Sequence, residues 1–411
     1  MSTAKTQEKR PGYKMTKLGW IPEDWEVKSL GDLGETINGL TYSPNDISEN
    51  GILVLRSSNV QNRVITYDDN VYVNTETFHK TKAGDILICV RNGSKSLIGK
   101  SALIDRISEG TAFGAFMSIY RSSLNNYLFQ IFGTDMYYRS VHKNLGATIN
   151  SINGKDLLKF KIPLPPLTEQ KKIAEILGTW DDAIAKTKDL IAQLKSRKKG
   201  LMQQLLSGKT RLPGYNENWK EVRYEDILEK VNRAFEWDDD RVYDLISVRR
   251  RSGGIFRRVP LYGHQIKVKN LRNVKEGDFL FSKMQIVHGA SAYVAAENDN
   301  TQISGSYISV VSKKPKVLDV RYLDWFSKTK LFYHHSFISS YGVHIEKMTF
   351  NYNLFVKEKI SIPSLNEQQA IIQILDTSDQ EIQKQEEKLA QLQATKKGLM
   401  QQLLTGEVRV N

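Results

Sequence analysis

A segment rich in arginine, residues 248–259, has the composition expected of a nucleic-acid contact. It reads Val-Arg-Arg-Arg-Ser-Gly-Gly-Ile-Phe-Arg-Arg-Val, which predicts a strand, a Gly-Gly turn and a second strand. Arginine can read guanine through two hydrogen bonds or hold a phosphate, so such a hairpin could enter a groove. A solvated basic loop without a ligand is the alternative. The candidate contacts are Arg249, Arg250, Arg251, Arg257 and Arg258.

A second set of polar residues follows a short frame that occurs in both halves of the chain. Lys-Ala-Gly-Asp-Ile at residues 82–86 matches Lys-Glu-Gly-Asp-Phe at residues 275–279, but the residues that follow differ. Two domains with the same scaffold but different polar loop residues could recognise two different targets. The alternative is that these loops carry no function and have simply diverged. Asparagine and glutamine suit adenine edges. The candidates are Arg91, Asn92, Lys95 and Lys100 in the first half, and Lys283, Gln285 and His288 in the second.

The charge of the chain favours a polyanionic partner. Its 411 residues include 59 Lys and Arg against 46 Asp and Glu, a formal net charge of +13. Most of the excess lies within residues 208–360. A local basic excess is a common footprint of phosphate-backbone binding. On charge alone, a soluble basic protein without a nucleic-acid role remains the alternative.

Composition also limits the class of protein. A chain of 411 residues is long enough for two domains. The single cysteine, Cys89, excludes internal disulfides and cysteine-cluster metal sites and suits a reducing cytoplasm. No stretch approaches about 18 apolar residues, and residues 1–11 lack the apolar core of a signal sequence. We therefore expect a cytoplasmic protein without a membrane partner.

Sequence strings typical of catalysis are missing. The Asn/Asp-Pro-Pro-Tyr/Phe string of amino-methyltransferases does not occur. Residues 93–101 place five residues between two glycines where a P-loop has four, which argues against a phosphate loop. The seven histidines show no metal-ligand spacing. We expect no catalytic residue, metal or cofactor in this chain.

The elements that must position these residues belong to a duplication. The string Lys-Lys-Gly-Leu-Met-Gln-Gln-Leu-Leu at residues 198–206 recurs unchanged at residues 396–404. Between residues 165–208 and 363–406, 24 of 44 aligned positions are identical. The chain is therefore a tandem duplication, and its function must use two copies of each part.

Each copy carries a heptad seam, in which apolar positions alternate in steps of four and three residues. The seam predicts a helix that starts after prolines, with Thr168 or Asn366 as N-cap, and ends at Gly208 or Gly406. About 38 residues would span roughly 57 Å. The apolar seam positions are Ile173, Leu177, Trp180, Ile184, Ile191, Leu194, Leu201 and Leu205 in the first copy, and Ile371, Leu375, Ile382, Leu389, Leu392, Leu399 and Leu403 in the second.

The connectivity of the chain predicts that the two helices pair antiparallel. A parallel pair would require the second globular segment to bridge a whole helix length, whereas an antiparallel pair lets it cap one end. This geometry predicts two domains about 60 Å apart on a rigid spacer, related by a pseudo-two-fold axis, with the two chain termini close together.

Two features of the seams depart from a simple coiled coil. Lys198 and Lys396 interrupt the apolar stripe, and polar seam positions can fix register and orientation. A second apolar edge is wider than a two-stranded coil requires. Packing on the adjacent domain and docking of another subunit both explain this edge. The docking candidates are Met202, Leu206, Met400 and Leu404.

The remaining sequence predicts an α+β fold. Short β-branched runs bounded by Gly, Asn, Asp and Ser alternate with helical pieces near residues 125–140 and 323–335. The predicted organisation is a globular domain at 1–160 (with a loose leader at 1–14), a spacer helix at 161–208, a second globular domain at 209–360 and a second spacer helix at 361–411.

This layout resembles the specificity subunit of a type I restriction–modification enzyme. The resemblance rests on two variable domains, each followed by a helix that starts with Pro-Pro-Leu-Thr-Glu-Gln (165–170) or Pro-Ser-Leu-Asn-Glu-Gln (363–368) and ends with the repeated string. It implies a non-catalytic subunit whose two domains read the halves of a bipartite, asymmetric site in double-stranded DNA. It also implies two modification subunits, which use S-adenosylmethionine to methylate adenine at N6, and two restriction subunits, which use ATP and Mg²⁺.

Two other classes of protein are alternatives. The first is a coiled-coil scaffold without a specific nucleic-acid role. The second is a self-contained enzyme, which the missing catalytic strings disfavour. Selection from random DNA sequences separates the first alternative from DNA recognition, and turnover by the isolated chain would support the second.

Overall fold

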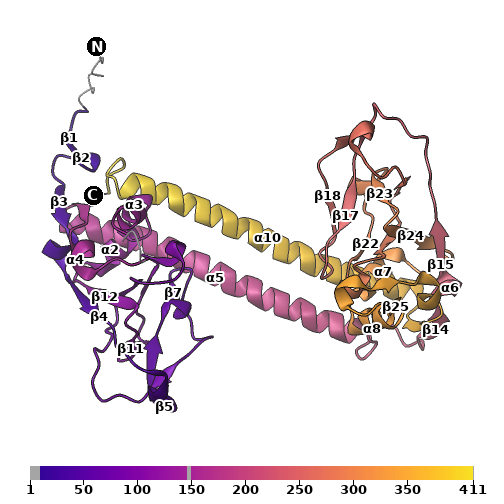
Figure 1. Ribbon diagram of the computed structural model, residues 1–411, viewed down its shortest axis with the longest axis horizontal. Coiled ribbons are helices and arrows are strands. Elements are labelled where there is room, and N and C mark those ends of the chain that lie inside the picture. The colour runs from indigo at the N-terminus through magenta and orange to yellow at the C-terminus, as the bar shows by residue number, and fades with distance from the viewer. Residues whose placement is uncertain (1–9, 146–149, 411) are drawn as a thin grey trace. The chain divides into compact units, whose positions relative to one another are not determined.

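The computed structural model describes residues 10–145 and 150–410, which divide into two compact units. Unit 1 comprises residues 1–188 and 388–411, and unit 2 comprises residues 189–387. Two long helices, α5 (Leu167–Leu205) and α10 (Leu365–Leu403), run through both units (Figure 1). Each unit therefore holds a mixed α+β domain, one part of α5 and one part of α10.

The domain of unit 1 is built on a four-stranded antiparallel sheet in the order β10-β9-β12-β4, and a smaller sheet has the order β11-β5-β8. Its elements are β1 (Tyr13–Thr16), β2 (Gly19–Pro22), β3 (Glu26–Ser29), α1 (Leu30–Leu33), β4 (Glu35–Asn38), β5 (Ile47–Leu55), β6 (Val60–Gln61), β7 (Val64–Ile65), β8 (Tyr72–Val73), β9 (Ile86–Cys89), β10 (Ser101–Leu103), β11 (Ala112–Phe113), β12 (Met117–Arg121), α2 (Asn125–Ile131), α3 (Asp135–Lys143), α4 (Gly154–Leu158) and β13 (Lys161–Leu164).

The domain of unit 2 has the matching four-stranded sheet in the order β22-β21-β24-β15. Its elements are β14 (Lys220–Arg223), α6 (Tyr224–Ile227), β15 (Leu228–Val231), β16 (Val242–Tyr243), β17 (Ile246–Val248), β18 (Ile255–Arg257), β19 (Leu261–Tyr262), β20 (Leu271–Asn273), β21 (Phe279–Ser282), β22 (Ser291–Tyr293), β23 (Gln302–Ser304), β24 (Tyr307–Ser312), α7 (Val320–Phe326), α8 (Lys330–Ile338), β25 (Ser340–Tyr341), β26 (Thr349–Phe350), α9 (Tyr352–Phe355) and β27 (Lys359–Ile362).

The frame shared by the two halves forms the turn before a central strand. Gly84 and Gly277 adopt φ values of +86° and +91°, which only glycine adopts without strain. The aspartate that follows each glycine is buried and is bonded to an arginine, with Asp85 2.6 Å from Arg121 and Asp278 2.5 Å from Arg233. Each carboxylate also accepts the backbone N–H of the frame lysine. The frame therefore works as a structural staple in both domains.

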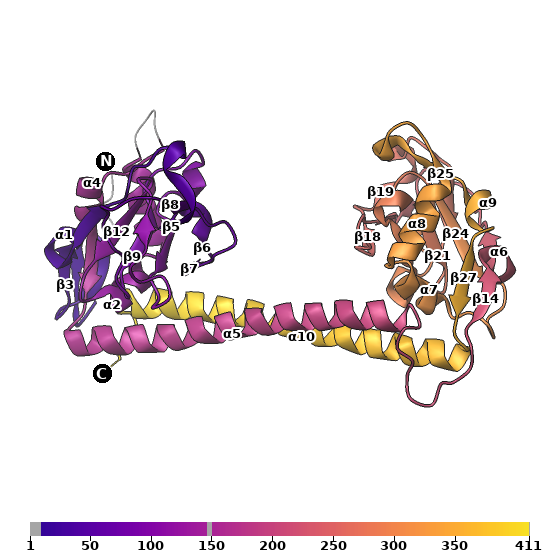
Figure 2. The same cartoon turned by 90° about the horizontal axis from the view of Figure 1, so that it is seen from below.

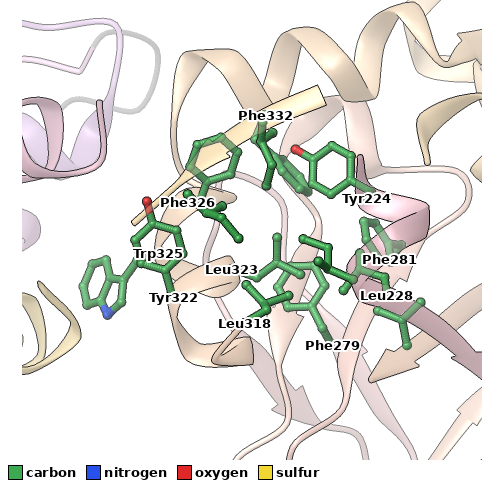
Figure 3. Packing of buried hydrophobic residues seen from close by; sticks show 14 of the residues in the cluster. Tyr224, Leu228, Phe279, Phe281, Leu318, Tyr322, Leu323, Trp325, Phe326 and Phe332 are labelled. Carbon is green, nitrogen blue, oxygen red and sulfur yellow. The ribbon is translucent and has the colours of Figure 1, made fainter. Parts of the chain in front are cut away.

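Aromatic side chains make up much of the core of unit 2. Phe279 and Phe281 from β21 pack with residues of α7 and α8, which cover one face of the sheet (Figures 2 and 3). Tyr224 stacks on Phe355 with ring centroids 4.3 Å apart. The helices predicted near 125–140 and 323–335 are each divided into two short helices. Thr134 and Thr329 are the N-caps of the second helix in each pair.

The long helices lie antiparallel within each unit, as their connectivity predicts. In unit 1, Lys396 of α10 places its Nζ 2.5 Å from Asp181 of α5. In unit 2, Lys198 of α5 forms the equivalent ion pair with Asp379 of α10. The two pairs are related by the repeat, so the lysines that interrupt the seams meet aspartates on the partner helix.

Every residue of the two heptad seams is buried or half-buried. Among the first-copy positions, Ile173, Leu177, Ile191, Leu194 and Leu205 are buried, and Trp180, Ile184 and Leu201 are half-buried. In the second copy Ile371, Leu375, Ile382 and Leu403 are buried, and Leu389, Leu392 and Leu399 are half-buried.

The start of each helix is clamped by a buried glutamate. In unit 1, Glu169 accepts a hydrogen bond of 2.9 Å from Trp25 Nε1 and pairs with Arg409 at 2.8 Å. In unit 2, Glu367 accepts from Trp219 Nε1 at 3.3 Å and from Arg211 Nε at 2.7 Å. The arginine in each clamp follows the end of one long helix, and the glutamate lies at the beginning of the other.

Several predicted boundaries are corrected by the structure. The helices begin at Leu167 and Leu365, so Thr168 and Asn366 lie inside the first turn and are not the N-caps. The segments 161–208 and 361–411 each begin with strand residues, because β13 and β27 pair with β3 and β14. Of the predicted leader at 1–14, residues 1–9 lie outside the described residues, and β1 starts at Tyr13.

The glycines predicted to end the helices, Gly208 and Gly406, have φ values of +68° and +73°. They follow the last helical residues by three positions and accommodate the left-handed turn that leads the chain away from the helix. In the part of the chain that the structure describes, no helix is long and apolar enough to cross a membrane.

Candidate nucleic-acid interface

The arginine-rich segment of unit 2 forms a hairpin. Strand β17 pairs antiparallel with β18, and Val248 lies opposite Ile255. The tip closes through a hydrogen bond of 2.9 Å from the Arg249 N–H to the Gly254 carbonyl. Arg251 and Ser252 adopt φ values of +57° and +53°, which are costly for residues with side chains. The tip must therefore be held by its surroundings.

The surroundings of the tip are the residues that follow the shared frame. The Arg251 N–H donates to the His288 carbonyl at 2.6 Å, and the Ser252 N–H donates to the Gly289 carbonyl at 2.9 Å. The Ser252 hydroxyl also lies 3.1 Å from the Tyr333 hydroxyl. The fold thus joins two candidate sets, the hairpin arginines and His288, that are about 40 residues apart in the sequence.

The hairpin arginines differ in what their side chains contact. The Arg249 guanidinium lies 4.5 Å from the centroid of the Phe256 ring. Arg250 forms an exposed ion pair of 2.8 Å with Glu346, whose carboxylate also lies 3.3 Å from His288 Nε2. The Arg251 and Arg258 side chains are exposed and have no polar partner among the described residues. These two are the most available to a phosphate or a base edge.

The other candidates of unit 2 are partly engaged within the protein. Arg257 binds Asp244 at 2.6 Å and also donates to the Glu297 carbonyl. Lys283 donates to the Gly305 carbonyl at 2.7 Å. Gln285 is half-buried, and its side-chain oxygen has no partner among the described residues.

In unit 1 the candidates follow strand β9. The Asn92 side chain donates to the Ser57 hydroxyl at 3.1 Å, and Lys100 lies 3.4 Å from the Ser57 carbonyl. Burial lowers the pKa of Lys100. The Arg91 guanidinium lies 5.7 Å from the centroid of the Phe116 ring, and Lys95 is exposed. Arg91, Asn92 and Lys100 are thus linked to the neighbouring segments 56–61 and 114–117.

These contacts reveal residues that the sequence did not single out. A cavity of about 560 Å³ beside this cluster is lined by Arg56, Ser57, Tyr42 and Phe116, among others. Phe116 is 55% exposed and lies beside Arg91 at the edge of this cavity. In unit 2 the residue missed is Glu346. Neither Phe116 nor Glu346 belongs to a motif that marks it in the sequence.

Two findings bear on metal and thiol chemistry among the described residues. No group of three His, Cys, Asp or Glu side chains there could hold a metal ion. Cys89 is buried, and desolvation raises the pKa of its thiol to about 11. Because the thiolate is the reactive form, this cysteine is a packing residue.

The predicted docking residues divide into two kinds. Leu206 and Leu404 are each 2% exposed and belong to the cores of units 2 and 1. Packing on the adjacent domain, one of the two explanations of this edge, accounts for these two leucines, and a docking role for them stays a prediction. Met202 and Met400 are half-buried against the same cores.

Comparison with known proteins places this geometry in context. Residues 22–196 and 216–394 match the family described as the type I restriction modification DNA specificity domain. The chain is 28% identical, over 98% of each chain, to a Methanocaldococcus jannaschii protein provisionally assigned as the MjaX type I restriction enzyme specificity subunit. It is 29% identical to the EcoKI specificity subunit of Escherichia coli over 46% of this chain and 43% of that protein. The S subunit of the M. genitalium type I system shares the fold, with a TM-score of 0.61 and 13% identity over 92% of this chain and 96% of that one.

Proposed function

Because the chain belongs to the family of type I restriction–modification specificity subunits, we propose that it is the DNA-recognition subunit of such a complex, without catalysis of its own. One observation carries the proposal: two domains with the same strand order present different polar side chains after the same frame. Two domains that share a scaffold but differ in the polar residues they expose can recognise two different half-sites.

In this proposal the domain at 1–160 reads one half of a bipartite, asymmetric site and the domain at 209–360 reads the other. The spacer segments 161–208 and 361–411 set the gap between the half-sites, because helix length fixes a distance along the duplex. Arg251 and Arg258 contact phosphates or guanine edges. The amide of Asn92 is bonded to Ser57 and Ser94 and supports the contact surface. The side chains already engaged within the protein, such as Arg257 and Lys283, orient the contact surface.

The proposed partners supply the chemistry. Two modification subunits bind S-adenosylmethionine and methylate adenine at N6, and they dock on the helix segments. Two restriction subunits, which use ATP and Mg²⁺, complete the complex in the cytoplasm. The chain itself holds no cofactor in this proposal.

Sequencing of methylated bases in the source genome tests the proposal. We expect one methylated split motif, with a fixed gap, that disappears when this gene is deleted and returns with a plasmid copy. The purified chain should transfer no methyl group alone and should do so when the modification subunit is added. A contiguous methylated motif would overturn the two-reader arrangement, and a methylome unchanged by the deletion would favour a scaffold role.

A further inference from the structure

A groove of about 640 Å³ lies between α2 and the part of α5 that belongs to unit 1. Its apolar lining includes Leu124, Ala174 and the half-exposed Leu167. Gly178 also lines it, and a Cβ atom at this glycine would meet no atom within 4 Å. The small residues at 174 and 178 leave room for another backbone to approach α5.

The tandem repeat supplies an internal comparison for this groove. Helices α2 and α7 each have seven residues and precede matching capped helices, so Gln130 corresponds to Trp325. The 198-residue repeat makes Ala174 correspond to Ile372 and Gly178 to Asp376.

In unit 2 the matching place is filled. Ile372 is buried, and the buried Trp325 donates from Nε1 to Asp376 Oδ1 at 2.8 Å. In unit 1 the smaller residues at the same positions leave the space open.

The groove also contains hydrogen-bond acceptors without donors. Gln170 and Gln130 are 5% and 3% exposed, and the side-chain oxygen of each has no partner among the described residues. The counterpart of Gln170 is Gln368, whose oxygen accepts the Asp319 N–H at 2.9 Å. A buried acceptor without a donor costs about 1–3 kcal/mol. Both oxygens are closed to solvent, so the wall beneath the groove is incompletely hydrogen-bonded in unit 1, whereas Gln368 is satisfied at the matching place in unit 2.

The rim of the groove is acidic, although the chain as a whole is basic. Glu175 and Asp182 are exposed at the rim, where Lys171 is the one basic residue among the described lining residues, so the carboxylates are in excess. The repeat places uncharged Gln369, Gln373 and Gln380 at the matching positions. Asp181 also lines the groove, but it is bonded to Lys396 and Gln130. The free carboxylates therefore favour a cation and disfavour nucleic acid.

We propose that this groove binds one segment of a partner polypeptide in which a lysine or arginine stands beside an apolar side chain. The apolar side chain packs between Leu124 and Ala174, and the cation pairs with the rim carboxylates of Glu175 and Asp182. Because Ile372, Trp325 and Asp376 fill the matching place in unit 2, the described residues offer this site once. The identity of the partner as a modification subunit rests on the proposed function; the chemistry of the groove does not.

A labelled full-length chain tests the chemistry of the groove. Cys89 is buried, so an environment-sensitive dye can be attached at Lys171→Cys on the rim, with Gln369→Cys at the repeat position as the matched control. The probe is the capped peptide acetyl-Leu-Arg-Leu-amide. We expect a saturable dye response at position 171, a weak or absent response at 369, and no response to acetyl-Leu-Glu-Leu-amide. Equal responses at both positions, or none at 171, would overturn the proposal.

Two variants of the labelled chain separate charge from shape. Glu175→Gln with Asp182→Gln copies the rim of unit 2 and changes only exposed residues, so the fold should be kept. We expect its affinity for the arginine peptide to fall at least about tenfold, close to 1.4 kcal/mol. Ala174→Ile narrows the groove and should have a similar effect. Unchanged affinity in the charge variant contradicts the proposal even if the isoleucine variant fails to fold.

A photo-crosslinker at Lys171→Cys then identifies the partner with the purified modification subunit. We expect crosslinks to a segment that contains a lysine or arginine next to an apolar residue. Crosslinks to a second copy of this chain, or to DNA, would overturn the assigned occupant. The methylated split motif is measured on the wild-type chain, so loss of the motif and failure of the groove are separate results.

Discussion

Lys198 and Lys396 occupy seam positions that would ordinarily hold an apolar residue. Each reaches an aspartate on the other long helix, but their surroundings differ. The Lys396 side chain is 8% exposed, whereas that of Lys198 is 25% exposed and lies 5.3 Å from the centroid of the Trp325 ring. Burial lowers the pKa of Lys396, and the hydrogen bond to Asp181 opposes that shift. The lysine–aspartate ion pair at this position of the repeat is therefore shielded from solvent at its lysine in unit 1 and more exposed to solvent there in unit 2.

This difference predicts unequal costs for the same substitution. Lys396→Met should lower the free energy of unfolding by about 1–3 kcal/mol, because it leaves Asp181 beside an apolar seam. Lys198→Met should cost less than about 1 kcal/mol, since that pair is solvent-screened. Urea denaturation of both variants measures the two values. Equal losses would show that burial does not decide the contribution of the pair.

His335 gives unit 2 a dependence on pH. It is buried, and its Nδ1 lies 3.4 Å from the Tyr224 hydroxyl. Burial lowers its pKa from the ordinary value of 6.5, an effect that nearby Glu358 opposes and His334 reinforces. The unfolded chain therefore takes up a proton at a higher pH than the folded chain. Stability is complete above about pH 6.5 and falls as the pH drops towards the folded pKa.

We expect unit 2 to lose stability as the pH falls below about 6.5, and His335→Gln to reduce that loss. Denaturation at several pH values on either side of this value measures the slope. His334→Gln is the matched control, because His334 is exposed and adjacent. The assignment fails if the His334 variant flattens the slope as much as the His335 variant does.

At the scale of elements, the arginine hairpin depends on the turn against which it rests. Gly289 has a φ of +75°, and a Cβ atom there would lie 1.9 Å from the Tyr333 hydroxyl. That hydroxyl also contacts Ser252 at the hairpin tip. One glycine therefore permits both the turn and the anchoring of the tip.

Gly289→Ala should destabilise unit 2 by about 1–3 kcal/mol through backbone strain, with the clash as an added cost. It should also weaken DNA binding by releasing the hairpin tip. The control is Gly277→Ala, where φ is +91° but a Cβ atom would meet nothing within 4 Å. Thermal melting and binding assays compare them. A larger loss of DNA binding in the Gly277 variant would contradict a role for the anchored tip.

The hairpin arginines should act mainly through phosphate charge. Replacing Arg249, Arg250 and Arg251 with glutamine should weaken DNA binding and make its salt dependence shallower, by up to about three counterions. The control removes the same charge from the exposed Lys313, Lys314 and Lys316. Binding is measured over a series of salt concentrations. An unchanged slope in the arginine variant would place the hairpin away from DNA.

Local patterns in the sequence predicted more of the elements than of their contacts. The heptad spacing predicted seam positions that are buried or half-buried in the structure, and the Gly-Gly pair predicted the hairpin. Both patterns depend on residues only a few positions apart in the sequence. The meeting of Arg250 with Glu346, or of Asn92 with Ser57, joins residues far apart in the chain. The helix starts were misplaced because the backbone oxygens of Pro166 and Ser364 already accept the first helical hydrogen bonds.

At the scale of the whole molecule, the duplication makes each unit a control for the other. The clamps on Glu169 and Glu367 are equivalent, whereas the groove beside Ala174 and the filled place beside Ile372 are not. What the units share describes the scaffold. Features found in only one unit, such as the groove beside Ala174, indicate surfaces whose function is specific to that unit.

The units also differ in how they are assembled from the chain. Unit 2 is one continuous stretch, but unit 1 needs residues 388–411 to complete its core. A chain that ends at Glu387 should keep unit 2 folded and lose Leu403, Leu404 and the Arg409 clamp. Burial of those two leucines alone is worth about 3–6 kcal/mol, comparable with the stability of a domain. Hydrogen exchange should show fast exchange in β9 and β12 and slow exchange in β21 and β24. Slow exchange in all four strands would refute this.

The clamp between Glu169 and Arg409 has a consequence for synthesis. The ribosome makes the first domain before the second, yet unit 1 is not closed until residue 409 has left the exit tunnel. At about 5–20 residues per second, the strands of unit 1 wait roughly 10–50 s for their last partner. Unit 2 can close while unit 1 is still open. The half of the protein that is translated first is therefore finished last, and it is the half that nascent-chain chaperones would have to shield.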